Sequence, residues 1–277
     1  MNSSVFIHAL FNQHQKSTKA FPDKALAVEF IDGFFKFLFI PDRQKKMSEY
    51  ELSKEFESYK SHLSTLIYDV IADGEKTQQI TNLFFDEINN VYDALQKDAA
   101  AILQFDPAAE SIEEVLVAYP GFYATAVYRL SNQLWKQGVK LLPRVFAEYA
   151  HSKTGIDIHP GATIGSSFFI DHGTGIVIGE TTVIGNNVKI YQGVTLGALS
   201  VNKANAKSKR HPTIQDNVVI YSGATILGGD TVIGSNSVIG GNVWLTNSVL
   251  PQSIVYHKSE ISIRDKNPLP EVLNFVI

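Results

Sequence analysis

The sequence predicts an α+β fold in which an N-terminal all-helical part is followed by a C-terminal parallel β-helix. The main observation is an aliphatic residue at every sixth position from about residue 158 to 250. A period of six fits neither an amphipathic helix, which repeats near 3.6, nor an alternating strand. It is typical of a β-helix, whose coils each contain three short strands of about six residues. The aliphatic positions are Ile158, Ile164, Ile170, Ile178, Ile184, Ile190, Leu196, Ile214, Ile220, Ile226, Ile233, Ile239 and Leu245.

The second observation is a set of apolar stripes at helical spacing over residues 1 to about 150. The stripes cover 26–38, which Pro41 closes, 52–67, and 80–95, which runs into Asp98. Two further helices are expected after a break at Asp106-Pro107, divided by Pro120-Gly121. The stripes are unusually aromatic for short helices, so part of this surface is expected to pack against another subunit.

The hexads carry Gly, Asn and Asp where tight corners require a positive φ. Their phase slips by two residues between Ile176 and Ile178, and by one near Ile226 to Ile233, and each slip indicates a loop or bulge. The basic stretch 197–212 breaks the ladder and is expected to be an exposed loop. We therefore expect a helical assembly domain over 1–150, a β-helix over 151–255 and a C-terminal tail over 256–277.

Composition narrows the class of protein. The 277 residues carry a formal net charge of −4, which argues against generic nucleic-acid binding. The chain has no cysteine, which excludes disulfides, a thiol nucleophile and thiolate metal ligands. The N-terminal residues lack the features of a secretion signal, and no apolar run reaches the roughly 20 residues that a membrane span needs. A cytoplasmic, soluble protein is the expectation.

Acidic and imidazole side chains cluster at three places in the ladder. The clusters are Asp157 with His159, Asp171 with His172, and Arg210 with His211. Because one coil takes about eighteen residues, Asp157 is expected to approach His172 and orient one ring nitrogen, leaving the other free as a base. The alternative is that each residue only caps a turn or lies on the surface. No metal site is expected, because a zinc site of three histidines in such folds includes a pair four residues apart, which His151, His159, His172 and His211 lack.

Four motifs together resemble serine O-acetyltransferase, a hexapeptide-repeat acyltransferase family of cysteine synthesis. They are DIHPGATIG, IDHGTGIVIGE, YQGVTLGA and RHPTI, and the resemblance covers roughly residues 103 to 245, including FDPAAES. It implies that the β-helix is left-handed, which the periodicity cannot show because ordinary crossovers have the opposite hand.

The resemblance also implies roles for particular residues. His172 is expected to take the proton from the serine hydroxyl, while Asp157 orients its ring. Asp106 and Asp171 are expected to pair with the serine ammonium, so the helical domain contributes part of the substrate site. Arg210 and His211 are expected to hold the serine carboxylate.

The co-substrate implied is acetyl-CoA, with no metal. A backbone N–H near Ala198 is expected to meet the oxyanion, and the pantetheine arm is expected to lie beside Ser222 and Gly241. Lys203, Lys207 and Lys209 are candidates for the CoA phosphates, although a solvated loop is the favoured interpretation. The chain departs from the family at Ala198, where a second Gly is usual, and in its longer basic loop.

The family resemblance also implies an oligomeric state and a protein partner. A homotrimer is expected, with His172 and His211 from different subunits, or a dimer of trimers joined through the helical domain. Cysteine feedback is expected at the serine site, and the tail ending at Ile277 is a candidate ligand for O-acetylserine sulfhydrylase. Other functions remain open: a hexapeptide acetyltransferase for another hydroxyl or amine acceptor, a zinc-dependent hydratase, or a non-catalytic trimeric scaffold.

Overall fold

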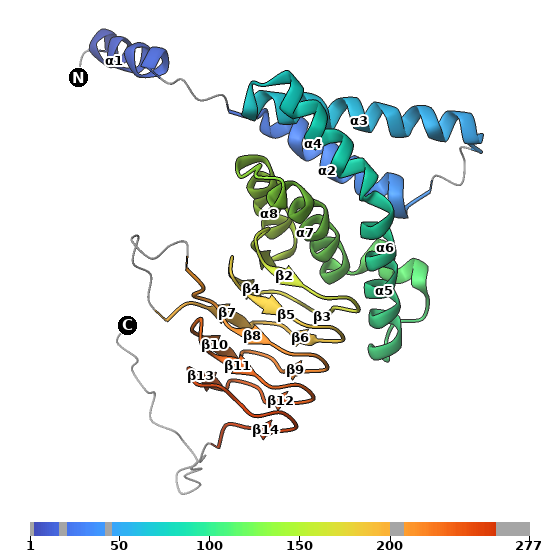
Figure 1. The fold of residues 1–277 in the computed structure, drawn as a ribbon, viewed down its shortest axis with the longest axis vertical. Coiled ribbons are helices and arrows are strands. Elements are labelled where there is room, and N and C mark those ends of the chain that lie inside the picture. Colours follow the sequence, from blue (N-terminus) through green and yellow to red (C-terminus); the bar gives the residue numbers. More distant parts are fainter. Residues whose placement is uncertain (1–2, 17–20, 42–45, 200–207, 259–277) are drawn as a thin grey trace, which may run out of the picture.

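A computed structural model describes residues 3–16, 21–41, 46–199 and 208–258 of the chain. Within these residues, helices come first and a stack of β-coils follows (Figure 1). The helices are Ser3–Lys16 (α1), Lys24–Phe39 (α2), Glu49–Ile71 (α3), Gly74–Asp86 (α4), Ile88–Phe105 (α5), Ile112–Ala118 (α6), Pro120–Lys136 (α7) and Leu141–Thr154 (α8).

The strands follow from residue 157 to 255, and each is two or three residues long. They are Asp157–Ile158 (β1), Thr163–Ile164 (β2), Phe169–Asp171 (β3), Val177–Ile178 (β4), Val183–Ile184 (β5), Lys189–Tyr191 (β6), Thr195–Gly197 (β7), Thr213–Ile214 (β8), Val219–Ile220 (β9), Thr225–Leu227 (β10), Val232–Ile233 (β11), Val238–Ile239 (β12), Trp244–Leu245 (β13) and Ile254–Val255 (β14).

Three parallel sheets form the sides of a left-handed β-helix. The first sheet is β1-β4-β7-β10-β13, the second β2-β5-β8-β11 and the third β3-β6-β9-β12-β14, so each coil passes through the three sheets in turn. The aliphatic positions of the hexads point inward, and Ile178, Ile190 and Leu196 are buried in one continuous core. The fold class predicted from the period of six is confirmed.

Both phase slips coincide with enlarged turns. Asp157 lies beside Val177, twenty positions on, whereas Val177 lies beside Thr195, eighteen positions on. The two extra residues fall between β3 and β4, where His172 has a φ of 56° and Gly173 a φ of 88°. The second slip falls between β10 and β11, where Gly228 has a φ of 105°.

The helical part follows the predicted stripes, but it also contains two helices that no stripe predicted, α1 and α8. Helices α2 and α3 occupy the first two stripes, and α6 and α7 lie on either side of the break at Pro120. The third stripe spans two helices, α4 and α5, which meet at Glu87. The stripe continues across this junction because Phe84, Ile88 and Val91 all face the same core.

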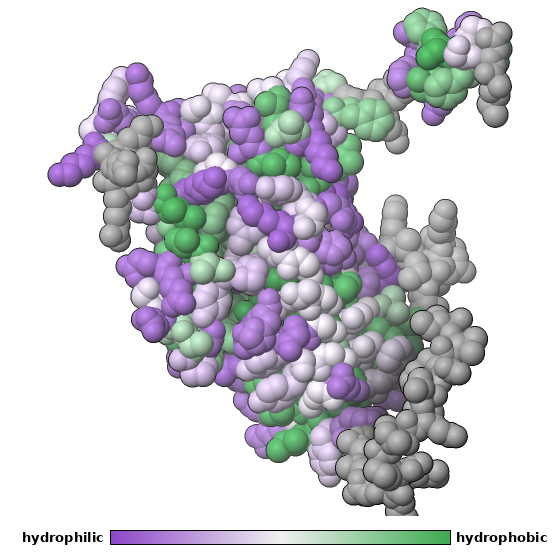
Figure 2. All heavy atoms as spheres, turned by 180° about the vertical axis from the view of Figure 1, so that it is seen from behind, coloured by the Kyte–Doolittle hydropathy of each residue, from purple (hydrophilic) through white to green (hydrophobic). Residues whose placement is uncertain are grey.

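Helix α1 stands apart from the other helices (Figures 1 and 2). Its apolar residues Val5, Phe6, Ile7 and Phe11 are exposed. Among the described residues, none of the helices has the length and apolarity needed to cross a lipid bilayer.

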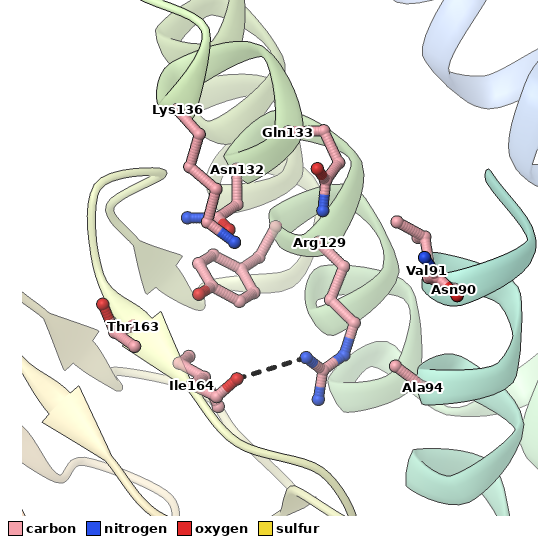
Figure 3. Close-up of a pocket in the computed structure, with 10 residues that line it drawn as sticks. Asn90, Val91, Ala94, Arg129, Asn132, Gln133, Lys136, Thr163 and Ile164 are labelled. Atoms are coloured by element: carbon pink, nitrogen blue, oxygen red, sulfur yellow. Dashed lines mark hydrogen bonds between the residues drawn. The ribbon is translucent and has the colours of Figure 1, made fainter. Parts of the chain in front are cut away.

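Helix α7 caps the first coil of the β-helix. A first coil has no preceding strand to bond its carbonyl groups, and α7 supplies the missing donors from its side chains. The Tyr128 hydroxyl donates to Ala162 O at 2.7 Å, and Asn132 Nδ2 donates to Pro160 O at 2.8 Å. Arg129 donates to the carbonyls of Ile164 at 3.3 Å (Figure 3) and Gly165 at 2.7 Å.

Asp98 of α5 balances the buried guanidinium of Arg129. Arg129 donates to its two carboxylate oxygens at 2.5 and 2.9 Å, and the backbone N–H of Phe168 donates to Asp98 Oδ1 at 2.8 Å. Burial raises the pKa of Asp98, while Arg129 and the Phe168 N–H oppose that change by stabilising the carboxylate. The pair thus joins α5, α7 and the first coil.

We predict that Arg129→Met lowers the free energy of unfolding by about 3–5 kcal/mol, because it leaves the buried Asp98 charge uncompensated. Urea denaturation followed by circular dichroism measures the change. The matched control is Arg144→Met, which removes a surface ion pair with Glu148 and is expected to cost less than about 1 kcal/mol. Equal effects of the two substitutions contradict the capping role.

Candidate functional site

The candidate residues lie at two corners of the β-helix, on either side of the first sheet. We call the turns between the third and first sheets the His172 corner (residues 171–175, 191–193, 221–223 and 240–242). The turns between the first and second sheets form the His211 corner (residues 159–162, 179–182, 197–199, 209–212 and 227–231). The first sheet lies between the two groups within one chain.

The carboxylates of Asp106 and Asp171 both lie near the His172 corner. Asp106 follows α5 and accepts hydrogen bonds from the Tyr119 hydroxyl at 2.6 Å and from Ala108 N at 2.8 Å. Asp171 ends β3 and is largely buried. The hydrogen bond to Asp106, burial and then the charges of Asp106 and Asp171 all raise the pKa of Tyr119. Both carboxylates therefore lie close to this phenol.

Tyr191 lies beside the same two acids. It is the register partner of Asp171 on the next coil, and its ring stacks on Tyr221 at 5.0 Å. Burial raises the pKa of Tyr191, and the charges of Asp171 and Asp106 raise it further. The structure thus brings together the two acids that the sequence predicted, and surrounds them with tyrosines that the sequence analysis did not assign.

His172 protrudes from the enlarged turn beside these acids. Its side chain is 69% exposed, and its Nδ1 lies 3.6 Å from Asp171 Oδ1. A non-glycine residue with positive φ is uncommon and often marks a functional turn. An exposed imidazole next to a carboxylate can accept a proton from a bound hydroxyl.

Asp157 lies on the coil before His172. The two segments are hydrogen bonded, with Gly175 N to Gly155 O at 2.8 Å and Asp157 N to Ile176 O at 2.9 Å. In the described part of the chain, no hydrogen bond or ion pair joins the Asp157 and His172 side chains. Burial raises the pKa of Asp157. Among the charged side chains of α8, His151 and Arg144 lower this pKa and Glu148 raises it.

At the His211 corner, Thr181 fixes the orientation of His211. The backbone N–H of Thr181 donates to His211 Nδ1 at 3.0 Å, and the Thr181 hydroxyl lies 2.8 Å from the same nitrogen. Because Nδ1 accepts a backbone hydrogen, the proton of the neutral ring is on Nε2, which is therefore a donor. Burial lowers the pKa of His211 to about 4, with help from the charges of Arg210 and Lys209.

The ring of His211 lies over Gly179, which explains why this position has no side chain. A Cβ atom at Gly179 would lie 2.1 Å from the imidazole. The ring therefore occupies the outer surface of the first sheet at this coil.

Glu180 holds the guanidinium of Arg210 through an ion pair between Arg210 Nη2 and Glu180 Oε2. The Thr181 hydroxyl oxygen also accepts the backbone N–H groups of Arg210 at 2.9 Å and His211 at 3.1 Å. Sequence reasoning missed Glu180 and Thr181 as site residues, although Glu180 ends the motif IDHGTGIVIGE. Their adjacency to Arg210 depends on a register that spans about thirty residues.

His159 is partly buried and packs against the helical part of the protein. Its Nδ1 accepts from Gly161 N at 3.0 Å, and its ring lies 4.8 Å from the ring of Trp135. Burial lowers the pKa of His159 to about 4, and the Arg144 charge adds to this. His159 is a neutral packing residue that borders the Glu180–Arg210 pair.

The residues predicted to hold CoA fall at both corners. Ser222 and Gly241 stack on neighbouring coils at the His172 corner, and a Cβ atom at Gly241 would lie 3.2 Å from Ser222 O. Ala198 lies at the His211 corner, after β7. Lys209 Nζ donates to the carbonyls of Thr181 and Pro212 at 2.7 and 3.1 Å, so its ammonium is bound within the fold. Lys203 and Lys207 lie outside the described residues, as does Ile277.

In the described part of the chain, no group of three or more His, Asp or Glu side chains is placed to hold a metal ion. The two corners instead present two carboxylates at one and a guanidinium with a neutral imidazole at the other. This is the arrangement of charges that an amino acid requires at its two ends.

Comparisons with known proteins give relatives that cover part of this chain. No protein-family model matches the chain. A plasmid serine acetyltransferase of Synechococcus elongatus is 51% identical over 199 residues, which are 70% of this chain and 61% of that protein. A serine acetyltransferase of Helicobacter pylori is 50% identical over 123 residues, which are 44% of this chain and 70% of that protein. The chain thus spans about 60% of the length of the first of these relatives.

Solved structures match over more of the chain. Serine acetyltransferase isoform 3 of Entamoeba histolytica, in complex with cysteine, is 36% identical with a TM-score of 0.76 and covers 93% of this chain and 94% of its own. The serine complex of the Neisseria gonorrhoeae enzyme is 27% identical, covers 88% of this chain and 98% of its own, and has a TM-score of 0.59. A serine acetyltransferase in complex with CoA is 29% identical, covers 83% and 95%, and has a TM-score of 0.57.

The fold and its two corners define a left-handed β-helix protein of the hexapeptide-repeat class. The identities and coverage place it more narrowly. The chain belongs to the serine acetyltransferase family.

We predict that the protein loses stability as the pH falls from about 6.5 toward 4. His159 and His211 titrate near 4 when folded but near 6.5 in an unfolded chain, so in this window the unfolded state binds more protons. Their contribution is fully present above pH 6.5 and lost as the pH falls. Thermal midpoints at pH 7 and pH 5 measure it.

The matched variant is His211→Gln, which keeps an acceptor for Thr181 and cannot take up a proton. Its midpoint is expected to fall less between the two pH values than that of the unmodified protein. An equal fall in both proteins contradicts the neutral state of His211.

Proposed function

We propose that this protein is a serine O-acetyltransferase, which transfers the acetyl group of acetyl-CoA to the hydroxyl of L-serine and releases O-acetylserine and CoA. The observation that carries the proposal is the pairing of Asp106 and Asp171 at one corner with Arg210 and His211 at the other. Family membership supports it, as do the complexes of family members with serine, cysteine and CoA.

The two corners bind opposite ends of serine in this proposal. The carboxylates of Asp106 and Asp171 pair with its ammonium group. Arg210, held by Glu180, pairs with the serine carboxylate, and the Nε2–H of His211 donates a further hydrogen bond. These contacts position the serine hydroxyl beside His172.

His172 then acts as the general base. It removes the hydroxyl proton as the serine oxygen attacks the thioester carbonyl, and Asp157 stabilises the resulting imidazolium. The tetrahedral oxyanion is stabilised by a backbone N–H near Ala198. When the intermediate collapses, the C–S bond breaks and the CoA thiolate takes the proton back from His172.

The assembly proposed is a homotrimer in which each site combines His172 of one subunit with His211 of the next. It is supported by the separation of the two corners, which lie on opposite sides of the first sheet within one chain. The helical domain over 1–150 contributes Asp106 and joins trimers where a hexamer forms, and residues 151–255 form the catalytic domain. Cysteine, which resembles serine in all but one atom, competes for the same contacts. The tail ending at Ile277 remains a candidate for binding a sulfhydrylase.

We predict serine-dependent release of CoA from acetyl-CoA, measured as free thiol, with L-serine preferred to D-serine and homoserine. His172→Ala is expected to lower kcat by about 10² to 10⁴-fold, the usual contribution of a positioned base. His14→Ala, on α1 away from both corners, is the control and leaves the rate unchanged. A preferred acceptor other than serine, or a His172→Ala variant with full activity, overturns the proposal.

A second prediction concerns the shared site. Co-expressed His172→Ala and His211→Ala chains are expected to regain roughly a quarter of wild-type activity, because random mixing in a cyclic trimer leaves one intact site in each mixed assembly. Each variant alone remains nearly inactive. A mixture no more active than its parents shows that both histidines serve one chain.

A further inference from the structure

A tyrosine of the helical part holds one of the two carboxylates near the His172 corner. The Tyr119 hydroxyl donates a hydrogen bond of 2.6 Å to Asp106 Oδ2, across 13 positions of the chain. The other oxygen, Oδ1, accepts the backbone N–H of Ala108 at 2.8 Å. Each oxygen of this carboxylate therefore has its own donor, and the two hydrogen bonds together fix the orientation of the group.

The backbone restrains both partners of this hydrogen bond. Asp106 and Tyr119 each precede a proline, and a following proline favours an extended conformation. Asp106 accordingly has a φ of −93° and a ψ of 109°, and Tyr119 has a φ of −84° and a ψ of 113°. Because both backbones are already restrained, the hydrogen bond orders the two side chains at a low cost in conformational entropy.

From this geometry we infer that Tyr119 is a positioning residue for the substrate, which orients the Asp106 carboxylate toward the ammonium group of the acceptor amino acid. The inference rests on the proposed function and deepens it, because it names a residue that sets serine affinity by acting through Asp106. Tyr119 takes no part in the proton transfer at His172.

The second carboxylate explains why Asp106 needs to be held. The charges of Asp106 and Asp171 both act on the phenol of Tyr119, and like charges repel each other while no cation lies between them. Without its donor, the Asp106 side chain would relieve this repulsion by rotating toward solvent. The ammonium group of the substrate would then meet one carboxylate instead of two.

A phenol suits this task better than a cationic side chain. A lysine or arginine in its place would pair with the acids and compete with the ammonium group of the substrate. Tyr119 donates its hydrogen bond without adding charge, and the bond to Asp106 raises the pKa of the hydroxyl above its usual value. The hydroxyl therefore keeps its proton and remains a donor throughout the neutral pH range.

Packing alone does not hold the Tyr119 side chain. Tyr119 lines a cavity of about 310 Å³, together with Leu116, Val117 and Tyr123. Because this side of the residue faces open space, its position depends on the hydrogen bond that the hydroxyl makes. Removing the hydroxyl is therefore expected to release both the ring and the Asp106 carboxylate.

The experiment compares Tyr119→Phe with the unmodified protein in the thiol-release assay. The substitution is expected to raise the KM for L-serine about 10- to 100-fold, the equivalent of one hydrogen bond to a charged group. The KM for acetyl-CoA and the kcat are expected to stay at wild-type values, because the base and the thioester contacts are unchanged. A merely structural role would lower the thermal midpoint without raising the KM for serine alone.

The matched control is Tyr123→Phe, one turn further along the chain. It removes the same kind of hydrogen bond, from the Tyr123 hydroxyl to Asp32 Oδ1 at 2.6 Å, at a carboxylate that is not assigned to the substrate. Both KM values are expected to stay unchanged in this variant. The inference is overturned if the KM for serine does not rise in Tyr119→Phe, or rises equally in Tyr123→Phe.

A double-mutant cycle shows whether Tyr119 acts through Asp106. Asp106→Asn alone is expected to raise the KM for serine, because it removes a charge that faces the ammonium group. Adding Tyr119→Phe to Asp106→Asn is expected to raise this KM by less than about 2-fold further, because the charge to be positioned is already absent. Two effects that multiply in full show that Tyr119 acts elsewhere, and they reject the inference.

Failure of the proposed reaction gives a different result. If the unmodified protein prefers another acceptor that carries an ammonium group, the reaction is wrong, and Tyr119→Phe is expected to raise the KM for that acceptor instead. A preferred acceptor without an ammonium group overturns both proposals. If no acceptor is acetylated, calorimetric titration with L-serine measures the same loss of affinity in Tyr119→Phe, and the absence of serine binding to the unmodified protein also overturns both.

Discussion

The Asp98–Arg129 pair positions the candidate site as well as stabilising the junction between helices and coils. Arg129 bonds the exposed carbonyls of the first coil, and Asp98 binds both that guanidinium and the N–H of Phe168, which precedes β3. Helix α5, which carries Asp98, ends at Asp106, and β3 ends at Asp171. One buried ion pair therefore sets the spacing of the two carboxylates that face the proposed substrate.

The enlarged turn at His172 shows how a regular solenoid accommodates an exposed histidine. In the regular hexads, short turns keep side chains close to the sheet surface. The turn at His172 has two extra residues and a positive φ, and its imidazole protrudes from the regular stack of hexads. The surrounding coils stabilise that backbone conformation, because their strands stay in regular register on either side of the turn.

The two corners use histidine in different ways. His172 is open to solvent beside the carboxylate of Asp171. At the other corner, burial keeps His211 neutral and Thr181 fixes its tautomer, so that it serves as a donor. The positive charge at this corner is carried by Arg210, whose guanidinium forms an ion pair with Glu180. In the proposed mechanism, this division lets a single fold hold a base and a carboxylate-binding group at neutral pH.

The sequence by itself determined the β-helix, because the direction of each side chain in a hexad depends only on local backbone geometry. The family resemblance, which is carried by short contiguous motifs, implied Asp106, Asp171, Arg210 and His211 as neighbours of a substrate, and this stays a prediction. The sequence did not predict Glu180, Thr181 or Tyr119 as their partners, nor the Asp98–Arg129 pair. Those contacts join residues 13 to 31 positions apart, so they exist only after coil register and helix packing are set. Which side chains meet across such separations is decided by the tertiary structure, because no local pattern in the sequence specifies the register between elements.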